Sequence, residues 1–139
     1  MVNKAVTNSG EFQTLYTVDE SKTRFDSKIS SLDRAHVEKF AEYDSNVCDA
    51  ILEVKVSCVR LDKLISDYNL AELDLLYIDA EGYDLEIIKM IPWESCSVSN
   101  VLYEHCHLGT ESRAESYRLL RSRGFELYQH GRDVLAIKT

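Results

Sequence analysis

Two short acidic segments of the sequence could carry out chemistry. Asp79 and Glu81 lie in the stretch YIDAEGYD, at the end of an apolar run, and Glu104 and His105 end a second apolar run, VLYEH. Carboxylates and imidazoles can accept a proton from a substrate hydroxyl in general acid–base catalysis. The residue types therefore indicate a site that moves a proton with the protein's own side chains, and no metal is predicted.

Simpler interpretations of the same residues stay open. Glu81 and Asp84 could serve only to complement the positive N-terminus of the helix that follows them. Asp79 is harder to explain in this way, because a carboxylate at the end of a buried strand needs a partner or solvent. A metal site built from Asp79, Glu104, Cys106 and the two neighbouring histidines is a further alternative, although the spacing does not require it.

Alternating strands and helices are expected to position these side chains. Residues 73–78 form an almost continuous apolar run, as in a strand covered on both faces of a parallel sheet, and residues 98–105 repeat the pattern. Helical spacing of apolar residues follows each strand, over 84–90 and over 110–124. The order of these elements is strand, helix, strand, helix.

The remaining elements complete the predicted fold class. Strands are expected at 11–18 and 52–58, and the chain ends in a hairpin whose two-residue turn is Gly131-Arg132. Together these elements indicate an α/β layered sheet, mainly parallel, with an antiparallel C-terminal strand. Ligands bind beyond the carboxyl ends of the strands in such sheets. We therefore expect five side chains to crowd one rim: Asp79, Glu81, Glu104, His105 and His107.

Length and charge restrict the class of partner. The 139 residues fit a single domain, 1–139. With 16 basic and 24 acidic residues the net charge is −8, and a surface this negative repels phosphate backbones, so no nucleic-acid partner is expected. No stretch is apolar enough for a membrane span or a signal peptide. The 4 cysteines are too few for a disulfide scaffold, which favours a cytoplasmic protein with reduced thiols.

The acidic segments also resemble those of a known family. The stretch LDLLYIDAEGYDLEIIKMI, residues 73–91, resembles the signature of FkbM-type S-adenosylmethionine-dependent methyltransferases, in which a strand leads into I-D-x-E-G and then a helix. The segments KAVTNSGEFQTLYTV, VRLDKLI and VLYEHCH look like further pieces of the family, in the family's order. The resemblance runs from about residue 4 to the C-terminus.

The resemblance implies a fold and an activity. It implies a Rossmann-like methyltransferase fold with a seven-stranded sheet whose last strand is antiparallel. It also implies methyl transfer from S-adenosylmethionine, commonly to an oxygen of a small molecule, sugar or polyketide. By position, Asp79 would lie beside the methyl donor and the substrate, with Glu81 as its companion. Glu104 and His105 would line the acceptor pocket, with His105 as the expected base and Asp79 or Glu81 as the second choice.

One part of the family pattern is missing. Methyltransferases of this class bind the cofactor on a glycine-rich turn after the first strand, with an acid after the second. The 5 glycines of this chain, at residues 10, 82, 109, 124 and 131, are not clustered. Both elements would lie upstream of Met1, so the chain is expected to be the C-terminal portion of the fold, inactive without the cofactor turn. A bare sheet edge at 73–78 should then form a homodimer or be covered by 11–18 and 52–58.

Two other functions stay open on the sequence alone. A non-catalytic binding or scaffold module would keep the sheet as a surface for a partner and would not bind S-adenosylmethionine tightly. A metal-dependent hydrolase or transferase would use Asp79, Glu104 and the neighbouring histidines, and would contain a stoichiometric metal ion.

Overall fold

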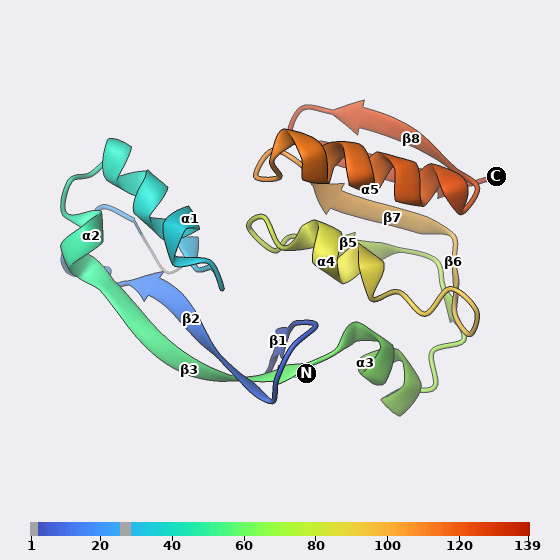
Figure 1. Cartoon of the computed structure of the whole chain (residues 1–139), viewed down its shortest axis with the longest axis horizontal. Helices are drawn as coiled ribbons and strands as arrows, with labels where there is room; N and C mark the ends of the chain where they lie inside the picture. Colours follow the sequence, from blue (N-terminus) through green and yellow to red (C-terminus); the bar gives the residue numbers. More distant parts are fainter. Residues whose placement is uncertain (1–2, 26–28) are drawn as a thin grey trace. The chain divides into compact units, whose positions relative to one another are not determined.

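The computed structural model describes residues 3–25 and 29–139, which form two compact units. Unit 1 comprises the residues up to Ala5 together with Gly10–Cys58, and unit 2 comprises Val6–Ser9 and Val59–Thr139. Figure 1 colours the chain from blue to red, so that unit 2 contains the yellow, orange and red elements. The expectation from the chain length, that residues 1–139 form a single domain, stays a prediction.

Unit 1 is built on an antiparallel strand pair. Strand β2 (Phe12–Val18) pairs with β3 (Ile51–Val59), and β1 (Ala5–Val6) lies on the other side of β3. Both long strands are rich in β-branched and aromatic residues, which suit a pleated surface. The strands predicted at 11–18 and 52–58 are therefore confirmed, although they form a sheet of their own.

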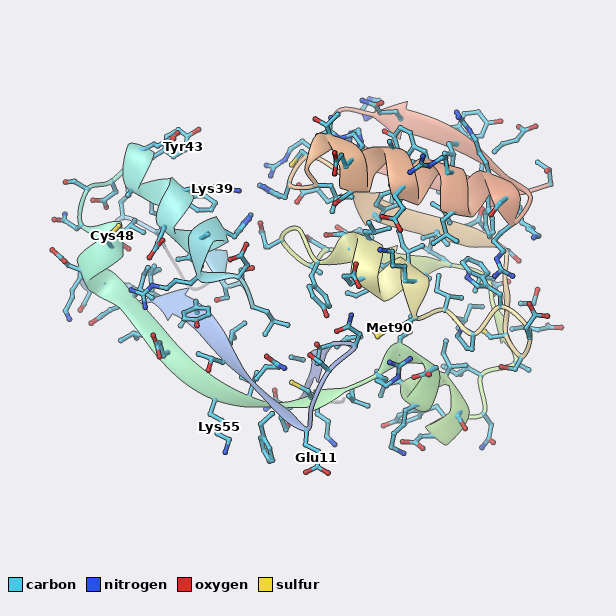
Figure 2. The ribbon with its side chains drawn as sticks, viewed as in Figure 1. Glu11, Lys39, Tyr43, Cys48, Lys55 and Met90 are labelled. Atoms are coloured by element: carbon cyan, nitrogen blue, oxygen red, sulfur yellow. The ribbon has the colours of Figure 1, made fainter. Side chains whose placement is uncertain are left out.

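Short helices connect the two long strands of unit 1. They are α1 (Arg34–Glu38), the 3₁₀ helix η2 (Lys39–Glu42) and α2 (Val47–Ala50). The Asp33 carboxylate caps α1 by accepting a hydrogen bond from the backbone N–H of Ala35. Figure 2 shows Tyr43 and Cys48 on this helical part, and both side chains are exposed.

The main sheet of unit 2 has the strand order β5-β7-β9-β8. These are β5 (Leu76–Ile78), β7 (Asn100–Glu104), β9 (Asp133–Lys138) and β8 (Phe125–His130). Strands β5 and β7 are parallel, whereas β9 is antiparallel to both β7 and β8. The α/β class and the antiparallel C-terminal strand are thus confirmed.

The prediction of a mainly parallel sheet of seven strands is not confirmed. The C-terminal hairpin inserts β9 between β7 and β8, so two of the three neighbouring strand pairs in the main sheet are antiparallel. Within residues 3–25 and 29–139, the strands fall into three separate sheets of three, two and four strands. The turn of the hairpin is the predicted Gly131-Arg132, with φ of 59° at Gly131.

The predicted continuous strand at 73–78 is interrupted. Strand β4 (Glu72–Leu73) pairs in parallel with β6 (Ser97–Val98), and both break off before β5 and β7 begin. At the break, the Asn100 side-chain amide donates to the backbone carbonyl of Asp74 at 2.8 Å. At this position, a hydrogen bond from a side chain replaces a backbone hydrogen bond between neighbouring strands.

Helices cover one face of the main sheet. Helix α4 (Asp84–Lys89) contacts α5 (Thr110–Ser122), and Figure 1 shows both on the same face. Helix α3 (Leu61–Asp67) contributes Leu61 and Ile65 to the core. The fully buried side chains of this core include Ile88, Val101, Tyr103, Leu120 and Val134. No helix in the described part of the chain is long and apolar enough to cross a membrane.

The opposite face of the main sheet carries an apolar row. Tyr77, Leu102, Leu135 and Tyr128 stand in register across β5, β7, β9 and β8. Tyr77 is 60% exposed and Tyr128 is 53% exposed. Strand β5 also lies at the edge of this sheet, and β2 and β3 belong to another sheet. The expectation that residues 11–18 and 52–58 cover this edge stays a prediction. The alternative, a homodimer, stays a prediction.

Candidate functional site

Three carboxylates converge where β5 and β7 end. The two strands are parallel and pair Ile78 with Tyr103, so that their carboxyl ends meet at the same edge of the sheet. Carboxylate oxygens of Asp79, Glu81 and Glu104 lie within 4.8 Å of one another. We call these three residues the acidic rim. The structure therefore brings together three of the side chains that the sequence predicts to meet.

The acidic rim lies beside the face of the main sheet opposite α4 and α5. Strand alternation places Glu104 on the same face as Leu102, whose partner across the sheet is Tyr77. The Asp79 carboxylate is close enough to the Tyr77 hydroxyl to raise the pKa of that phenol, with smaller contributions from its partial desolvation and the charges of Asp133 and Glu104. A solvent-facing tyrosine hydroxyl thus stands next to the carboxylates.

His107 and Arg132 complete the polar surroundings of the rim. The His107 Nε2 atom lies 3.3 Å from Glu81 Oε2 and 3.3 Å from Glu104 Oε2. Arg132, in the hairpin turn, places its Nε atom 2.9 Å from Glu104 Oε1 and its Nη2 atom 2.7 Å from His107 Nε2. A guanidinium group can only donate hydrogen bonds, so Arg132 is the donor in both of these contacts.

Cys106 meets the same arginine. Its Sγ atom lies 3.2 Å from Arg132 Nε. Burial raises the pKa of the Cys106 thiol, which outweighs the opposite effect of the hydrogen bond from Arg132. The sulfur at the rim is therefore a neutral thiol near neutral pH and is not activated as a nucleophile.

His105 contacts helix α5. It follows Tyr103 on the covered face of the sheet and is only 2% exposed. Its Nδ1 atom lies 2.7 Å from the hydroxyl of Tyr117 on α5, and the two rings are stacked. Helix α5 covers the face toward which this side chain points, and the expectation that His105 crowds one rim with the carboxylates stays a prediction. Its role as the base stays a prediction.

A buried aspartate supports the turn that carries Glu81. Glu81 and Gly82 both have positive φ angles, of 48° and 97°, so the backbone reverses sharply before α4. The Asp84 Oδ2 atom accepts a hydrogen bond from the Gly82 N–H at 3.3 Å. Asp84 is 0% exposed, and its burial raises the pKa to about 6. Its Oδ1 atom has no hydrogen-bond partner among the described residues.

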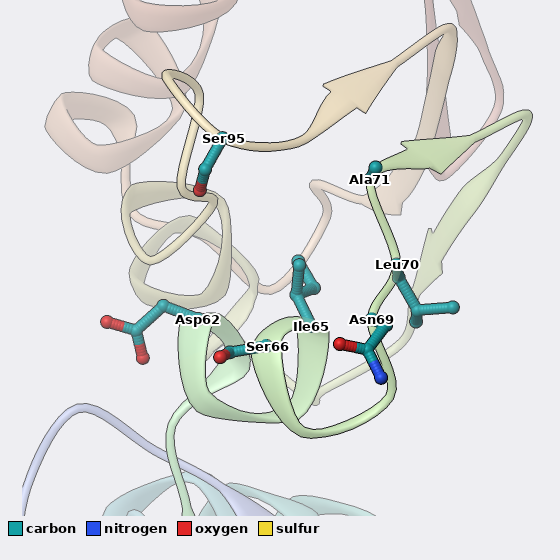
Figure 3. Close-up of a pocket in the computed structure, with 7 residues that line it drawn as sticks. All are labelled: Asp62, Ile65, Ser66, Asn69, Leu70, Ala71 and Ser95. Carbon is teal, nitrogen blue, oxygen red and sulfur yellow. The ribbon is translucent and has the colours of Figure 1, made fainter.

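A separate pocket lies at the other end of the sheet, before β4 begins (Figure 3). It has a volume of about 300 Å³ and contains no residue of the acidic rim. The Asp62 carboxylate at its wall is already bound by Arg60, at 3.0 Å. Its lining residues are Asp62, Ile65, Ser66, Asn69, Leu70, Ala71 and Ser95. The acidic rim is thus the better candidate for chemistry.

A comparison with known protein families identifies the family of the chain. The profile of the methyltransferase FkbM domain matches residues 1–127, which include every residue of the acidic rim. The chain belongs to the FkbM methyltransferase family. No curated protein and no solved structure matches it. The resemblance of residues 73–91 to the FkbM signature is thereby confirmed at the level of the family.

The surroundings of the rim in this member of the FkbM methyltransferase family include two residues that the sequence does not single out. Tyr77 is one member of an apolar strand pattern, and Arg132 is the second residue of a turn. The predicted hairpin could have pointed to Arg132. If a strand of this hairpin pairs with the strand that ends at Glu104, the turn that contains Arg132 lies at the same edge of the sheet as Glu104. This inference requires the order of the strands, which the sequence alone does not provide.

The methyl donor of such an enzyme fits this chain only in part. S-adenosylmethionine carries a positively charged sulfonium, and the acidic rim suits a cation of that kind. The 139 residues contain no glycine-rich turn to approach the rest of the cofactor closely. We therefore assign no residue here to the adenosine or amino-acid parts, and a cofactor contact of Asp79 stays a prediction.

Proposed function

We propose that the acidic rim is the acceptor site of an S-adenosylmethionine-dependent O-methyltransferase that acts on a hydroxyl group of a small molecule or sugar. One observation supports this most directly: three carboxylates meet beyond two parallel strands in a chain of a methyltransferase family. The order β5-β7-β9-β8, with β9 reversed, further supports a Rossmann-like methyltransferase sheet of which unit 2 is the C-terminal part.

The residues of the rim would have distinct tasks. S-adenosylmethionine, when bound, supplies a methyl group on its sulfonium. Glu81 and Glu104 accept hydrogen bonds from hydroxyl groups of the acceptor and hold it in place, which lowers the entropic part of the barrier. Arg132 fixes the orientation of the Glu104 carboxylate through its contact of 2.9 Å. An acceptor with several hydroxyl groups suits a rim made of hydrogen-bond acceptors, whereas a phosphorylated one would be repelled.

Asp79 is the residue that we propose as the proton acceptor. It is the exposed carboxylate of the rim, whereas Glu104 is already engaged by Arg132 and His107. The reacting hydroxyl would pass its proton to an Asp79 carboxylate oxygen as the methyl group is transferred. His105, the first choice on sequence grounds, would need to leave its contact with Tyr117 to reach a substrate at the rim.

The experiment is a methyl-transfer assay on the natural protein that contains these residues, with labelled S-adenosylmethionine and a panel of hydroxylated acceptors. Glu104→Gln should raise KM for the acceptor about tenfold, because one charged hydrogen bond is lost. Glu72→Gln, an exposed glutamate in β4 at the other end of the sheet, is the matched control and should behave as the unaltered protein. Binding of S-adenosylmethionine without transfer to any hydroxylated acceptor would contradict the proposal.

A further inference from the structure

The buried carboxyl group of Asp84 faces the backbone that carries two residues of the acidic rim. Its Oδ2 atom accepts a hydrogen bond of 3.3 Å from the N–H of Gly82, the residue that follows Glu81. Burial raises the pKa of Asp84, and nearby backbone N–H groups, among them those of Ala80 and Glu104, lower it in part. One side chain is thus close both to the turn after β5 and to the end of β7.

The turn that carries Glu81 has a backbone conformation that needs support from its surroundings. Glu81 has a φ of 48°, in the left-handed region, which is unfavourable for a residue with a side chain. Such a conformation persists where the surrounding contacts determine it. The next residue, Gly82, also has a positive φ, and its N–H is bound by Asp84. The Asp84 contact is therefore in the right place to keep Glu81 in this conformation.

A role of Asp84 in the start of α4 alone explains less of its surroundings. Asp84 is the first residue of this helix, where the helix dipole favours a carboxylate. That effect does not require burial, yet the side chain is 0% exposed, and Ala80, Gly82 and Glu104 all lie outside the helix. Burial of a carboxyl group costs stability unless hydrogen bonds compensate for it. The contacts that compensate here belong in part to the backbone of the rim.

We propose that Asp84 is a positioning residue of the acidic rim, which holds the turn of Glu81 against the end of the strand that carries Glu104. The two glutamates share a neighbour, since each places its Oε2 atom 3.3 Å from His107 Nε2. The consequence for catalysis rests on the proposed function, in which both glutamates hold the acceptor. A turn without its contact to Asp84 would let Glu81 move away from Glu104, and the acceptor would be held less well.

Amide hydrogen exchange of the full chain, measured by NMR at pH 7, tests the contact and requires no enzymatic activity. The Gly82 amide of the unaltered chain should exchange about tenfold or more slowly than a free peptide amide. Asp84→Ala removes the hydrogen-bond acceptor and should abolish this protection, whereas Asp84→Asn keeps an oxygen and should stay within about threefold of the unaltered chain. Both variants are neutral at this position, so the difference between them reports the acceptor atom and not the charge. Leu120→Val, at a fully buried residue of α5, is the control for a general loss of stability and should leave the Gly82 rate unchanged.

Methyl transfer by the natural protein that contains these residues tests the consequence for the acceptor. Asp84→Ala should raise KM for the acceptor about tenfold at an affinity for S-adenosylmethionine within about a factor of two, and Asp84→Asn should restore the KM. The proposal is overturned if the Gly82 amide of the unaltered chain is unprotected, if folded Asp84→Ala keeps the protection, if Asp84→Asn loses as much of it as Asp84→Ala, or if KM is the same in Asp84→Ala. If no hydroxylated acceptor is methylated, the proposed function fails, while the exchange rates still decide whether Asp84 holds the turn.

Discussion

Replacing Asp84 by asparagine should remove one pH-dependent contribution to the stability of unit 2. Asp84 is fully buried, and its carboxylate accepts a hydrogen bond from the Gly82 N–H at the turn that carries Glu81. Burial raises the pKa from 3.8 to about 6. Asparagine keeps an oxygen that can accept the same hydrogen bond but carries no charge, so the substitution separates the cost of ionisation from the loss of the contact.

The size of the effect follows from the pKa in the two states. Between about pH 4 and pH 6 the native protein binds a proton at Asp84 that the unfolded chain releases. The stabilisation from this proton is fully present below the unfolded pKa of 3.8 and is lost as the pH rises through about 6. A shift from 3.8 to about 6, at about 1.4 kcal/mol per pH unit, corresponds to about 3 kcal/mol.

Urea unfolding of the unaltered chain and of Asp84→Asn, at several values between pH 3 and pH 7, measures this difference. The stability of the variant minus that of the unaltered chain should rise by about 3 kcal/mol over this range. Asp74→Asn, at an exposed aspartate, is the control and should give a difference that does not change with pH. A constant or falling difference for Asp84→Asn would refute the claim that this buried carboxyl group ionises at a cost.

Three further predictions concern neighbouring parts of the molecule. His105→Ala should lower the free energy of unfolding by about 1 to 3 kcal/mol, because the Tyr117 hydroxyl loses a partly buried partner; a loss of turnover without any loss of stability would instead assign His105 the role of base. The open edge of β5 and the exposed row that includes Tyr77 should cause self-association that Tyr77→Glu weakens, and sedimentation showing a monomer at all concentrations would contradict this. The isolated chain should not bind S-adenosylmethionine tightly in calorimetry, since it has no glycine-rich turn, and tight binding would show that other residues replace the turn.

The convergence of the acidic rim could be predicted from sequence for a physical reason. Buried parallel strands are recognisable as apolar runs, and an acid directly after such a run lies at the carboxyl end of the strand. Asp79 and Glu104 meet because β5 and β7 are neighbours in the same direction. The antiparallel hairpin could also be predicted from the sequence, because Gly131 is suited to the first position of a two-residue turn.

Other features depend on tertiary contacts that no local pattern encodes. The contact of Arg132 with Glu104 exists because β9 pairs with β7. Local sequence patterns do not give this order of the strands in the sheet. The side on which His105 lies follows from strand alternation, but only the position of α5 decides that this side is covered. At the break between β4 and β5, the Asn100 side chain of a neighbouring strand donates a hydrogen bond to the Asp74 carbonyl.

The most direct test of the acidic rim as the acceptor site is the turnover of Asp79→Asn in the natural protein that contains these residues. If Asp79 accepts the proton of the reacting hydroxyl, kcat should fall about 100-fold or more, while the affinity for S-adenosylmethionine stays within about a factor of two. Turnover equal to that of the unaltered protein, at equal cofactor affinity, would contradict the account.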